Sequence, residues 1–200
     1  MNYSAGFTKE KWSEDELEIV IPMMLQGMEK QEIFEKVAEE NLFQLKNYLS
    51  VQYRFDIVHR RARTLSDRLK EAFVNGSDFD KKALTLFTFL LVYRFPMEFY
   101  REVVLDKYAK KEPLYRGDFH DFFETKAMQD EKAKSFRPET VKRLILSMMK
   151  FFKDAGLLQR VDGNQFEITP LHLSQDLKAY AEKHEPLLYS LSQLEKGEER

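Results

Sequence analysis

At 200 residues, the chain is long enough to bury a hydrophobic core, as one elongated domain or as two small ones. Hydrophobic residues make up 43% of it and charged residues 33%, which is typical of a folded soluble protein. The absence of cysteine excludes disulfides, a zinc ribbon and a thiol nucleophile, and it agrees with a cytoplasmic location. The longest apolar run, residues 83–93, is shorter than the roughly 20 residues of a membrane span, so we expect no membrane partner.

The formal net charge of −2 conceals an uneven distribution of charge. Residues 46–70, the first basic segment, carry seven Lys and Arg against two Asp. Residues 132–160, the second basic segment, carry eight Lys and Arg against one Glu and one Asp. Because local positive charge attracts phosphates whatever the net charge, two basic segments in an otherwise acidic chain favour a nucleic-acid partner.

The first third of the chain predicts three helices. The first spans about residues 14–26, where Pro22 predicts a kink or a division, and a short second helix follows over residues 30–40. The third has the clearest apolar periodicity, from Val51 to Leu69, and Arg54 and Arg61 flank that apolar stripe. A helix, a turn, a short helix and a basic helix form the order of a helix-turn-helix unit.

The segment Asn75-Gly76-Ser77 predicts a boundary between two domains. Residues 1–75 would form a helix-turn-helix-like domain, and residues 76–200 a helical core with a C-terminal winged helix. Residues 79–93 are apolar nearly all round, which predicts a central core helix. Pro96 predicts the first position of a further helix that runs to about Lys110.

The last third predicts the winged helix itself. One helix begins at Gly117-Asp118, and a longer one begins at Pro138 and ends at Gly156. Asp162-Gly163, between two alternating runs, predicts a β-hairpin, and a final helix follows over residues 174–184. The predicted fold class is therefore mainly α: a multi-helical protein with a helix-turn-helix-like unit near its N-terminus and one short hairpin in a C-terminal winged helix.

The two basic segments supply the predicted contacts to DNA. Arginine suits phosphates and guanine edges because its planar group bonds bidentately, and asparagine can read base edges. The alternative is that these charges form solvated helix faces that pair with the acidic remainder. The predicted DNA-binding residues are Arg54, Arg60, Arg61, Arg63, Arg137, Thr140, Lys142, Arg143, Lys150, Arg160 and Asn164.

Catalytic and metal-binding chemistry finds little support. Asp118, His120, Asp121 and Glu124 form a cluster in which His120 and Glu124 could share an ion, but Asp118 is better explained as a helix cap. The chain has no Gly-x-Ser-x-Gly motif and no glycine-rich phosphate loop. We therefore expect no catalytic residue, no metal, no cofactor and no enzymatic activity.

Three segments carry a resemblance to a known family: Tyr3-Ser4-Ala5-Gly6, the run from Glu39 to Gln44 before the arginine-rich helix, and Thr140 to Gly156-Leu157-Leu158. In these residues and in the order of its elements, the whole chain resembles the BrxA family of the bacterial BREX bacteriophage-exclusion systems. The resemblance implies helical proteins with winged-helix domains that bind double-stranded DNA beside a methyltransferase and an ATPase of the same system. It implies no catalytic residue.

Together, residues and resemblance predict a non-enzymatic accessory protein of phage defence that binds double-stranded DNA. The rival hypothesis is a protein-interaction scaffold whose winged helices dock other subunits of a defence complex, because a fold does not fix its function. Structured RNA is a third possible ligand.

Overall fold

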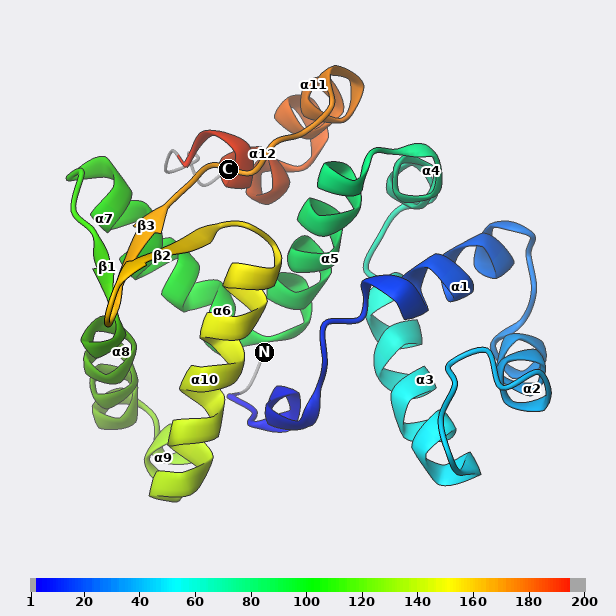
Figure 1. The fold of residues 1–200 in the computed structure, drawn as a ribbon, viewed down its shortest axis with the longest axis horizontal. Helices are drawn as coiled ribbons and strands as arrows, with labels where there is room; N and C mark the ends of the chain where they lie inside the picture. Colours follow the sequence, from blue (N-terminus) through cyan, green and yellow to red (C-terminus); the bar gives the residue numbers. More distant parts are fainter. Residues whose placement is uncertain (1–2, 195–200) are drawn as a thin grey trace.

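The computed structural model describes residues 3–194, and most of them lie in helices (Figure 1). The fold is mainly α, as the sequence predicts. The first half of the chain contains η1 (Gly6–Lys9), α1 (Glu14–Leu25), α2 (Lys30–Glu39), α3 (Tyr48–Ala62), α4 (Asp67–Asn75) and α5 (Asp78–Val92). The second half contains α6 (Arg94–Phe99), the π-helix η2 (Tyr100–Val104), α7 (Leu105–Ala109), β1 (Leu114–Tyr115), α8 (Arg116–Gln129), α9 (Glu131–Lys134), α10 (Pro138–Asp154), β2 (Leu158–Asp162), β3 (Gln165–Ile168), α11 (Gln175–His184) and α12 (Pro186–Gln193).

The long third helix of the prediction is two helices. α3 ends at Ala62, and the side chain of Ser66 caps α4 by accepting a hydrogen bond from the backbone N–H of Leu69. Serine at an N-cap satisfies a backbone donor that would otherwise lack a partner, so it favours a new helix start over continuation. The apolar pattern hides this break because Leu65 and Leu69 are buried on both sides of it.

Pro22 and Pro96 are both accommodated without a gap in helical structure. Pro22 lies in the last turn of α1 and does not divide it, and the helix then ends before Gly27, which has a φ of +79°. Pro96 is the third residue of α6 rather than the first, because that helix begins at Arg94. From there the chain stays helical to Ala109, one residue short of the predicted end.

α5 is the central helix of the fold. It packs against α1, α3 and α4 on one side and against α6, α10 and α12 on the other, which explains why its sequence is apolar nearly all round. Ser77 and Asp80 form a capping box at its start. A single buried cluster joins side chains from both predicted domains, among them Phe55 and Phe151, and the division into two domains stays a prediction.

The C-terminal unit contains the predicted hairpin. α10 begins at Pro138, and Gly156, with a φ of +87°, ends it, as the sequence predicts. β2 and β3 pair antiparallel, and Gly163 takes a φ of +40° in the turn between them. A left-handed φ of this kind is easiest for glycine, which is why the Asp-Gly signal located the turn correctly.

Three elements of this unit, β1, the short helix α9 and α12, escape the sequence prediction. β1 has only two residues and pairs with β3, which gives a three-stranded sheet in the order β1-β3-β2. α12 follows α11 after a break at Glu185, and Pro186 occupies its first position. Its residues Leu188 and Leu191 are buried, and α12 packs against α5 and α11.

Figure 1 shows how these parts are arranged. α1–α4 form one end of the molecule, and the sheet with α7, α8 and α9 forms the other. α10 lies at the front between them and packs on η1, α5, α8 and β2. Within residues 3–194, no helix combines the length and the apolar character that crossing a membrane requires.

Candidate nucleic-acid interface

Arg61, in the middle of the first basic segment, is fully buried and points into the protein core. Its Nε donates a hydrogen bond to Thr88 Oγ1 at 3.1 Å, and its Nη2 donates to the carbonyl oxygen of Thr85 at 2.6 Å. The guanidinium also lies over the rings of Phe89 and Phe151. Burial lowers the pKa of Arg61 to about 10, so the group stays charged at neutral pH. Arg61 joins α3 to α5 and cannot reach a phosphate.

Arg54 is buried as well, with 8% of its surface exposed. Its Nε lies 3.5 Å from Glu16 Oε1, and its Nη1 donates to Ser13 Oγ. The sequence predicts that Arg54 and Arg61 contact DNA, whereas both side chains are buried and have their partners within the protein. The signal was available in the sequence, because both arginines directly flank the apolar stripe of α3 and so lie at the border of its buried face.

The remaining charges of the first basic segment are mostly neutralised. Arg60 is half-exposed, but its Nη2 lies 3.3 Å from Glu10 Oε1 and also donates to the hydroxyl of Tyr93. Arg68 lies 4.0 Å from Glu71, and Lys70 lies 2.8 Å from Asp67. Arg63 is exposed and has no ion pair within residues 3–194. This segment therefore offers no continuous cationic surface.

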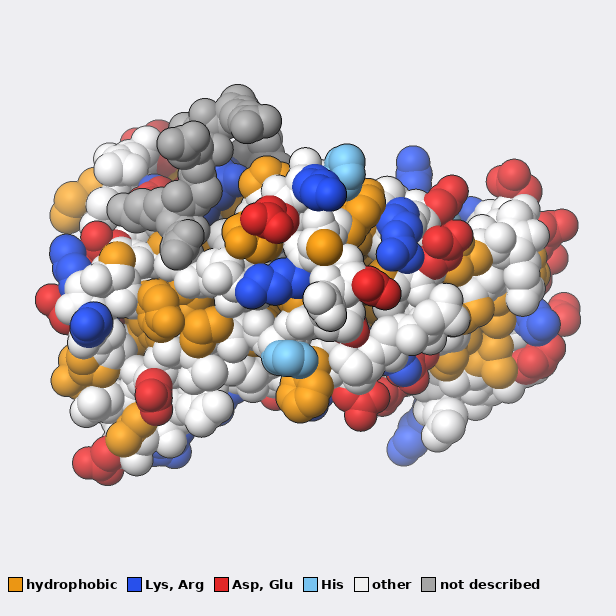
Figure 2. Space-filling view, turned by 90° about the horizontal axis from the view of Figure 1, so that it is seen from above, with side chains coloured by type: hydrophobic (Ala, Val, Ile, Leu, Met, Phe, Trp, Pro, Cys, Tyr) orange, Lys and Arg blue, Asp and Glu red, His pale blue; other side chains and the backbone are white. Residues whose placement is uncertain are grey.

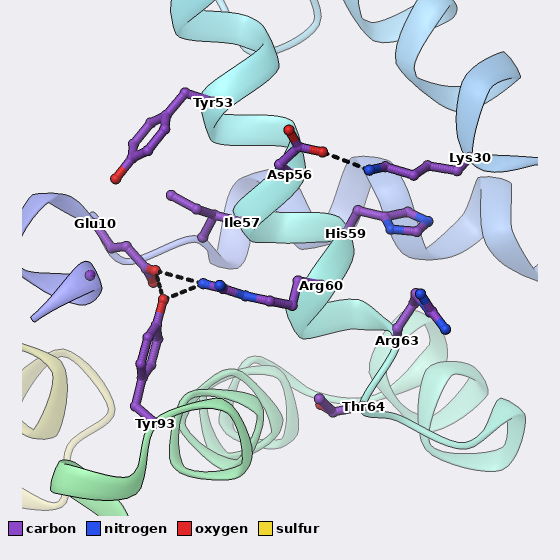
Figure 3. Close-up of a pocket in the computed structure, with 11 residues that line it drawn as sticks. Glu10, Lys30, Tyr53, Asp56, Ile57, His59, Arg60, Arg63, Thr64 and Tyr93 are labelled. Carbon is purple, nitrogen blue, oxygen red and sulfur yellow. Dashed lines mark hydrogen bonds and ion pairs between the residues drawn. The ribbon is translucent and has the colours of Figure 1, made fainter. Parts of the chain in front are cut away.

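Glu10 interacts with both Arg60 of α3 and Tyr93, as Figure 3 shows. Its side chain is 1% exposed, and its Oε1 accepts hydrogen bonds from Arg60 Nη2 and from the Tyr93 hydroxyl. Burial raises the pKa of Glu10, and the nearby positive charges of Arg61, Arg60 and Arg54 oppose that rise. Glu10 thus pairs with Arg60, one of the arginines that the sequence assigned to DNA.

These charged groups border a cleft of about 590 Å³ over the exposed face of α3 (Figure 3). Tyr53 stands at one end of that face, and Arg63 and Thr64 stand at the other. His59 is buried at its edge, and burial lowers the pKa of this imidazole. The lining residues are Gly6, Glu10, Lys30, Tyr53, Asp56, Ile57, His59, Arg60, Arg63, Thr64 and Tyr93.

The second basic segment is arranged differently, because α10 is sharply amphipathic. One side of the helix is buried through residues such as Leu144, Met148 and Phe152. Positions three, four, seven, eleven and fourteen after Glu139 fall on the opposite side, and all of them are exposed. This exposed stripe consists of Glu139, Lys142, Arg143, Leu146, Lys150 and Lys153.

Most cations of this stripe have no protein partner. Lys150 pairs with Asp154, which lies one turn further along α10. Among the residues that the structure describes, no carboxylate lies within ion-pair distance of Lys142, Arg143 or Lys153. The prediction did not include Lys153, although its spacing of three residues from Lys150 places both on one helix face.

The ends of this unit carry the other predicted residues. Arg137 is exposed at the N-cap of α10, whereas Thr140, one turn further on, is only half-exposed. At the tip of the hairpin, Arg160 Nε donates to the carbonyl oxygen of Gly163 at 2.9 Å, so its side chain lies over the turn. Asn164 is exposed, and its backbone carbonyl accepts a hydrogen bond from the N–H of Arg116.

A different face of the molecule shows what an ordinary surface of this protein looks like. Figure 2, seen from above, shows Lys and Arg interspersed with Asp and Glu and with hydrophobic side chains. On that face neither sign of charge dominates. The exposed stripe of α10, with four cations and one carboxylate, differs from this mixed face.

The cluster considered for a metal has a structural explanation for one of its members. Asp118 Oδ2 accepts a hydrogen bond from the N–H of Tyr115 at 2.6 Å, and its Oδ1 lies 3.0 Å from Lys107 Nζ. It therefore caps α8, as the sequence predicts. His120 and Glu124 are exposed on that helix. In the part of the chain that the structure describes, no group of three possible metal ligands occurs.

Comparison with known proteins places the chain among its relatives. The family model for BrxA matches residues 1–185. A protein from Bacillus cereus (strain H3081.97) named BREX protein BrxA is 29% identical over 157 residues, which cover 78% of this chain and 78% of that protein. The crystal structure of an uncharacterized protein from Magnetospirillum magneticum matches with a TM-score of 0.80 over 98% of this chain and 100% of that one. At 14% identity, this last likeness shows a shared fold.

Proposed function

This chain belongs to the BrxA family, and from that premise we propose that it is a non-enzymatic accessory protein of a BREX phage-defence system that acts in the cytoplasm by binding double-stranded DNA. The interface would be the exposed stripe of α10 together with Arg137 and the hairpin tip. The first basic segment would contribute little to duplex binding, because Arg54 and Arg61 are buried and Arg60 and Arg68 are paired, which leaves Arg63 as its one exposed and unpaired arginine among the described residues.

One observation carries this proposal: Lys142, Arg143 and Lys153 lie on one exposed helix face without a carboxylate partner among the described residues. Cations that have no ion pair in the protein can neutralise phosphates without first breaking an interaction. Neutralising phosphates releases counterions from the duplex, and this release is the main source of non-specific affinity for DNA. Binding would therefore be largely electrostatic, with a modest preference for sequence.

The arrangement of elements agrees with this assignment. α8, α10 and a hairpin follow each other along the chain, and β1 adds a third strand beside β3. We treat this unit as a winged helix, in which α10 enters the major groove and the hairpin lies against the backbone. Asn164 at the hairpin tip is then the residue best placed for a contact beyond phosphates.

A duplex titration tests the proposal. We expect the Lys142→Ala/Arg143→Ala double variant to bind a labelled duplex at least tenfold more weakly than the parent at low salt, because two phosphate contacts are lost. The matched control is Lys36→Ala/Lys46→Ala, which removes the same charge from exposed positions outside the interface. Equal affinities of the two double variants would contradict the proposed interface. Competition with structured RNA decides which nucleic acid is preferred.

A second function is favoured by the surface near α2. Tyr48 is 60% exposed and Leu49 is 75% exposed at the start of α3, and Tyr48 packs on Phe34 of α2. The exposed residues of α2 include three carboxylates, Glu32, Glu35 and Glu39, against two cations, Lys30 and Lys36. Such a surface suits a scaffold that docks another BREX protein, such as its methyltransferase or ATPase. Copurification with those proteins that survives nuclease treatment, and that Leu49→Ser abolishes, would support this role.

A further inference from the structure

We propose that the cleft over α3 binds a nucleoside phosphate, with the phosphate at Arg60 and Arg63 and the base on the ring of Tyr53. The cleft measures about 590 Å³, within the range of pockets that hold small ligands. Its walls come from the N-terminal segment through Gly6 and Glu10, and from Tyr93 at the end of α5 (Figure 3). This site is separate from α10 and does not depend on duplex binding there.

Arg60 forms the centre of the phosphate end. Its Nη2 is held by Glu10 and by Tyr93, while its Nε and Nη1 make no hydrogen bond within residues 3–194. About half of the side chain is exposed. The guanidinium is therefore fixed in position by one edge and keeps donors for an anion on its other side. Preorganisation of this kind lowers the entropic cost of binding a phosphate.

Other groups extend the cationic end. Arg63, the C-cap residue of α3, follows Arg60 by three residues and also lines the cleft, and no carboxylate among the described residues pairs with it. Lys30 reaches the cleft from α2, where its Nζ lies 2.7 Å from Asp56. Lys30 pairs with Asp56 and Arg60 pairs with Glu10, so both carboxylates of the cleft have a cationic partner. Their charges are thus partly neutralised before an anion arrives.

The opposite end of the cleft is aromatic and apolar. Tyr53 is 50% exposed and lies two helical turns before Arg60, with Ile57 between them on the same face. Two turns correspond to about 10 Å along the helix axis, which is comparable to the reach from a base to its phosphate. An exposed tyrosine ring offers a stacking surface to any base. The order aromatic, apolar, cation therefore matches the order of parts in a nucleotide.

The cleft suits an unpaired nucleotide rather than a nucleotide within a duplex. A base that is paired in a duplex is stacked on both faces, so it cannot also stack on Tyr53. The same chemistry can come from a free mononucleotide or from an unpaired nucleotide of a single strand. Inorganic phosphate would use only the cationic end of the cleft, and an uncharged nucleoside only the aromatic end.

Isothermal titration calorimetry of the full chain tests this site. The ligands are dAMP, deoxyadenosine, inorganic phosphate, an unstructured single strand and a duplex. We expect saturable binding of dAMP, with deoxyadenosine and phosphate each at least tenfold weaker. Tyr53→Ala should weaken dAMP binding by roughly tenfold, because stacking on an aromatic side chain contributes on that scale, whereas Tyr53→Phe should keep it. Tighter binding of the single strand than of dAMP would assign the cleft to unpaired nucleic acid.

Two further variants distinguish the two ends of the cleft from each other and distinguish this site from the duplex interface on α10. Arg63→Ala should weaken dAMP and phosphate alike, and Lys142→Ala/Arg143→Ala should leave dAMP binding unchanged. The inference is overturned if dAMP shows no saturable binding at millimolar concentration, if phosphate binds as tightly as dAMP, or if Tyr53→Ala has no effect. Duplex binding through α10 is measured independently, so either proposal can fail while the other stands.

Discussion

Arg61 Nη2 donates a hydrogen bond of 2.6 Å to the backbone carbonyl of Thr85, and through it a fully buried arginine joins α3 to the central helix α5. Two residues further along, Arg63 is exposed and has no ion pair within residues 3–194. Two arginines of the same helix therefore serve different purposes. One supports the fold, and the other belongs to the surface.

Substitution of these two arginines should distinguish the structural role of Arg61 from the surface position of Arg63. We expect Arg61→Ala to lower the free energy of unfolding by about 3 kcal/mol or more, because it leaves a cavity and removes the partners of Thr85 and Thr88. Arg63→Ala should change it by less than about 0.5 kcal/mol. Urea denaturation measures both values. Equal losses would show that Arg61 is not a structural residue of the core.

The pH dependence of stability should report on Glu10. Burial raises the pKa of this carboxyl in the folded state, so the folded chain holds a proton at pH values where the unfolded chain has released it. The contribution of Glu10 is therefore present in full below its ordinary pKa near 4.5 and is lost as the pH rises through the higher folded value. Relative to Glu10→Gln, the parent should become less stable over that interval.

The comparison with Glu10→Gln isolates this group, because other carboxyls titrate equally in both proteins. Urea denaturation of the two proteins at a series of pH values from 4 to 8 gives the difference directly. A difference that does not change with pH, or that changes in favour of the parent as the pH rises, would contradict the raised pKa.

Two glycines should respond oppositely to alanine. A Cβ added at Gly76 would lie 2.3 Å from the carbonyl oxygen of Ala72, so the backbone between α4 and α5 would have to shift. We expect Gly76→Ala to cost about 2 kcal/mol. Gly117, in the first turn of α8, has no atom within 4 Å of that position, and Gly117→Ala should stabilise the chain by a few tenths to about 1 kcal/mol. Thermal unfolding of both variants distinguishes the two effects, and a shift of the same sign in both would contradict them.

Much of the fold follows from local signals in the sequence. Pro138 and Gly156 bound α10 correctly, and Asp162-Gly163 locates the hairpin, because each needs a backbone conformation that these residues favour. The two-residue strand β1 is too short to show an alternating pattern. It exists because β3 offers it a partner, and that partner is distant in sequence.

At the candidate interface, residue type alone does not show whether a charged side chain is buried or exposed. Arg54 and Arg143 are the same kind of residue on amphipathic helices, yet the first is buried beside Glu16 and the second is exposed. The difference depends on Glu10, which precedes α1, and on Glu16 of α1, because these two carboxylates pair with arginines of α3. Sequence periodicity can show that a residue borders a buried face, but it cannot show which distant element covers that border.

The salt dependence of duplex binding tests the central claim most directly. Six cations of the proposed interface, Arg137, Lys142, Arg143, Lys150, Lys153 and Arg160, would reduce the affinity about a thousandfold between 50 and 200 mM salt if each meets a phosphate. The slope of log affinity against log salt should become shallower by about two in Lys142→Ala/Arg143→Ala and remain unchanged in Lys36→Ala/Lys46→Ala. A parent protein whose duplex affinity does not respond to salt would contradict the account.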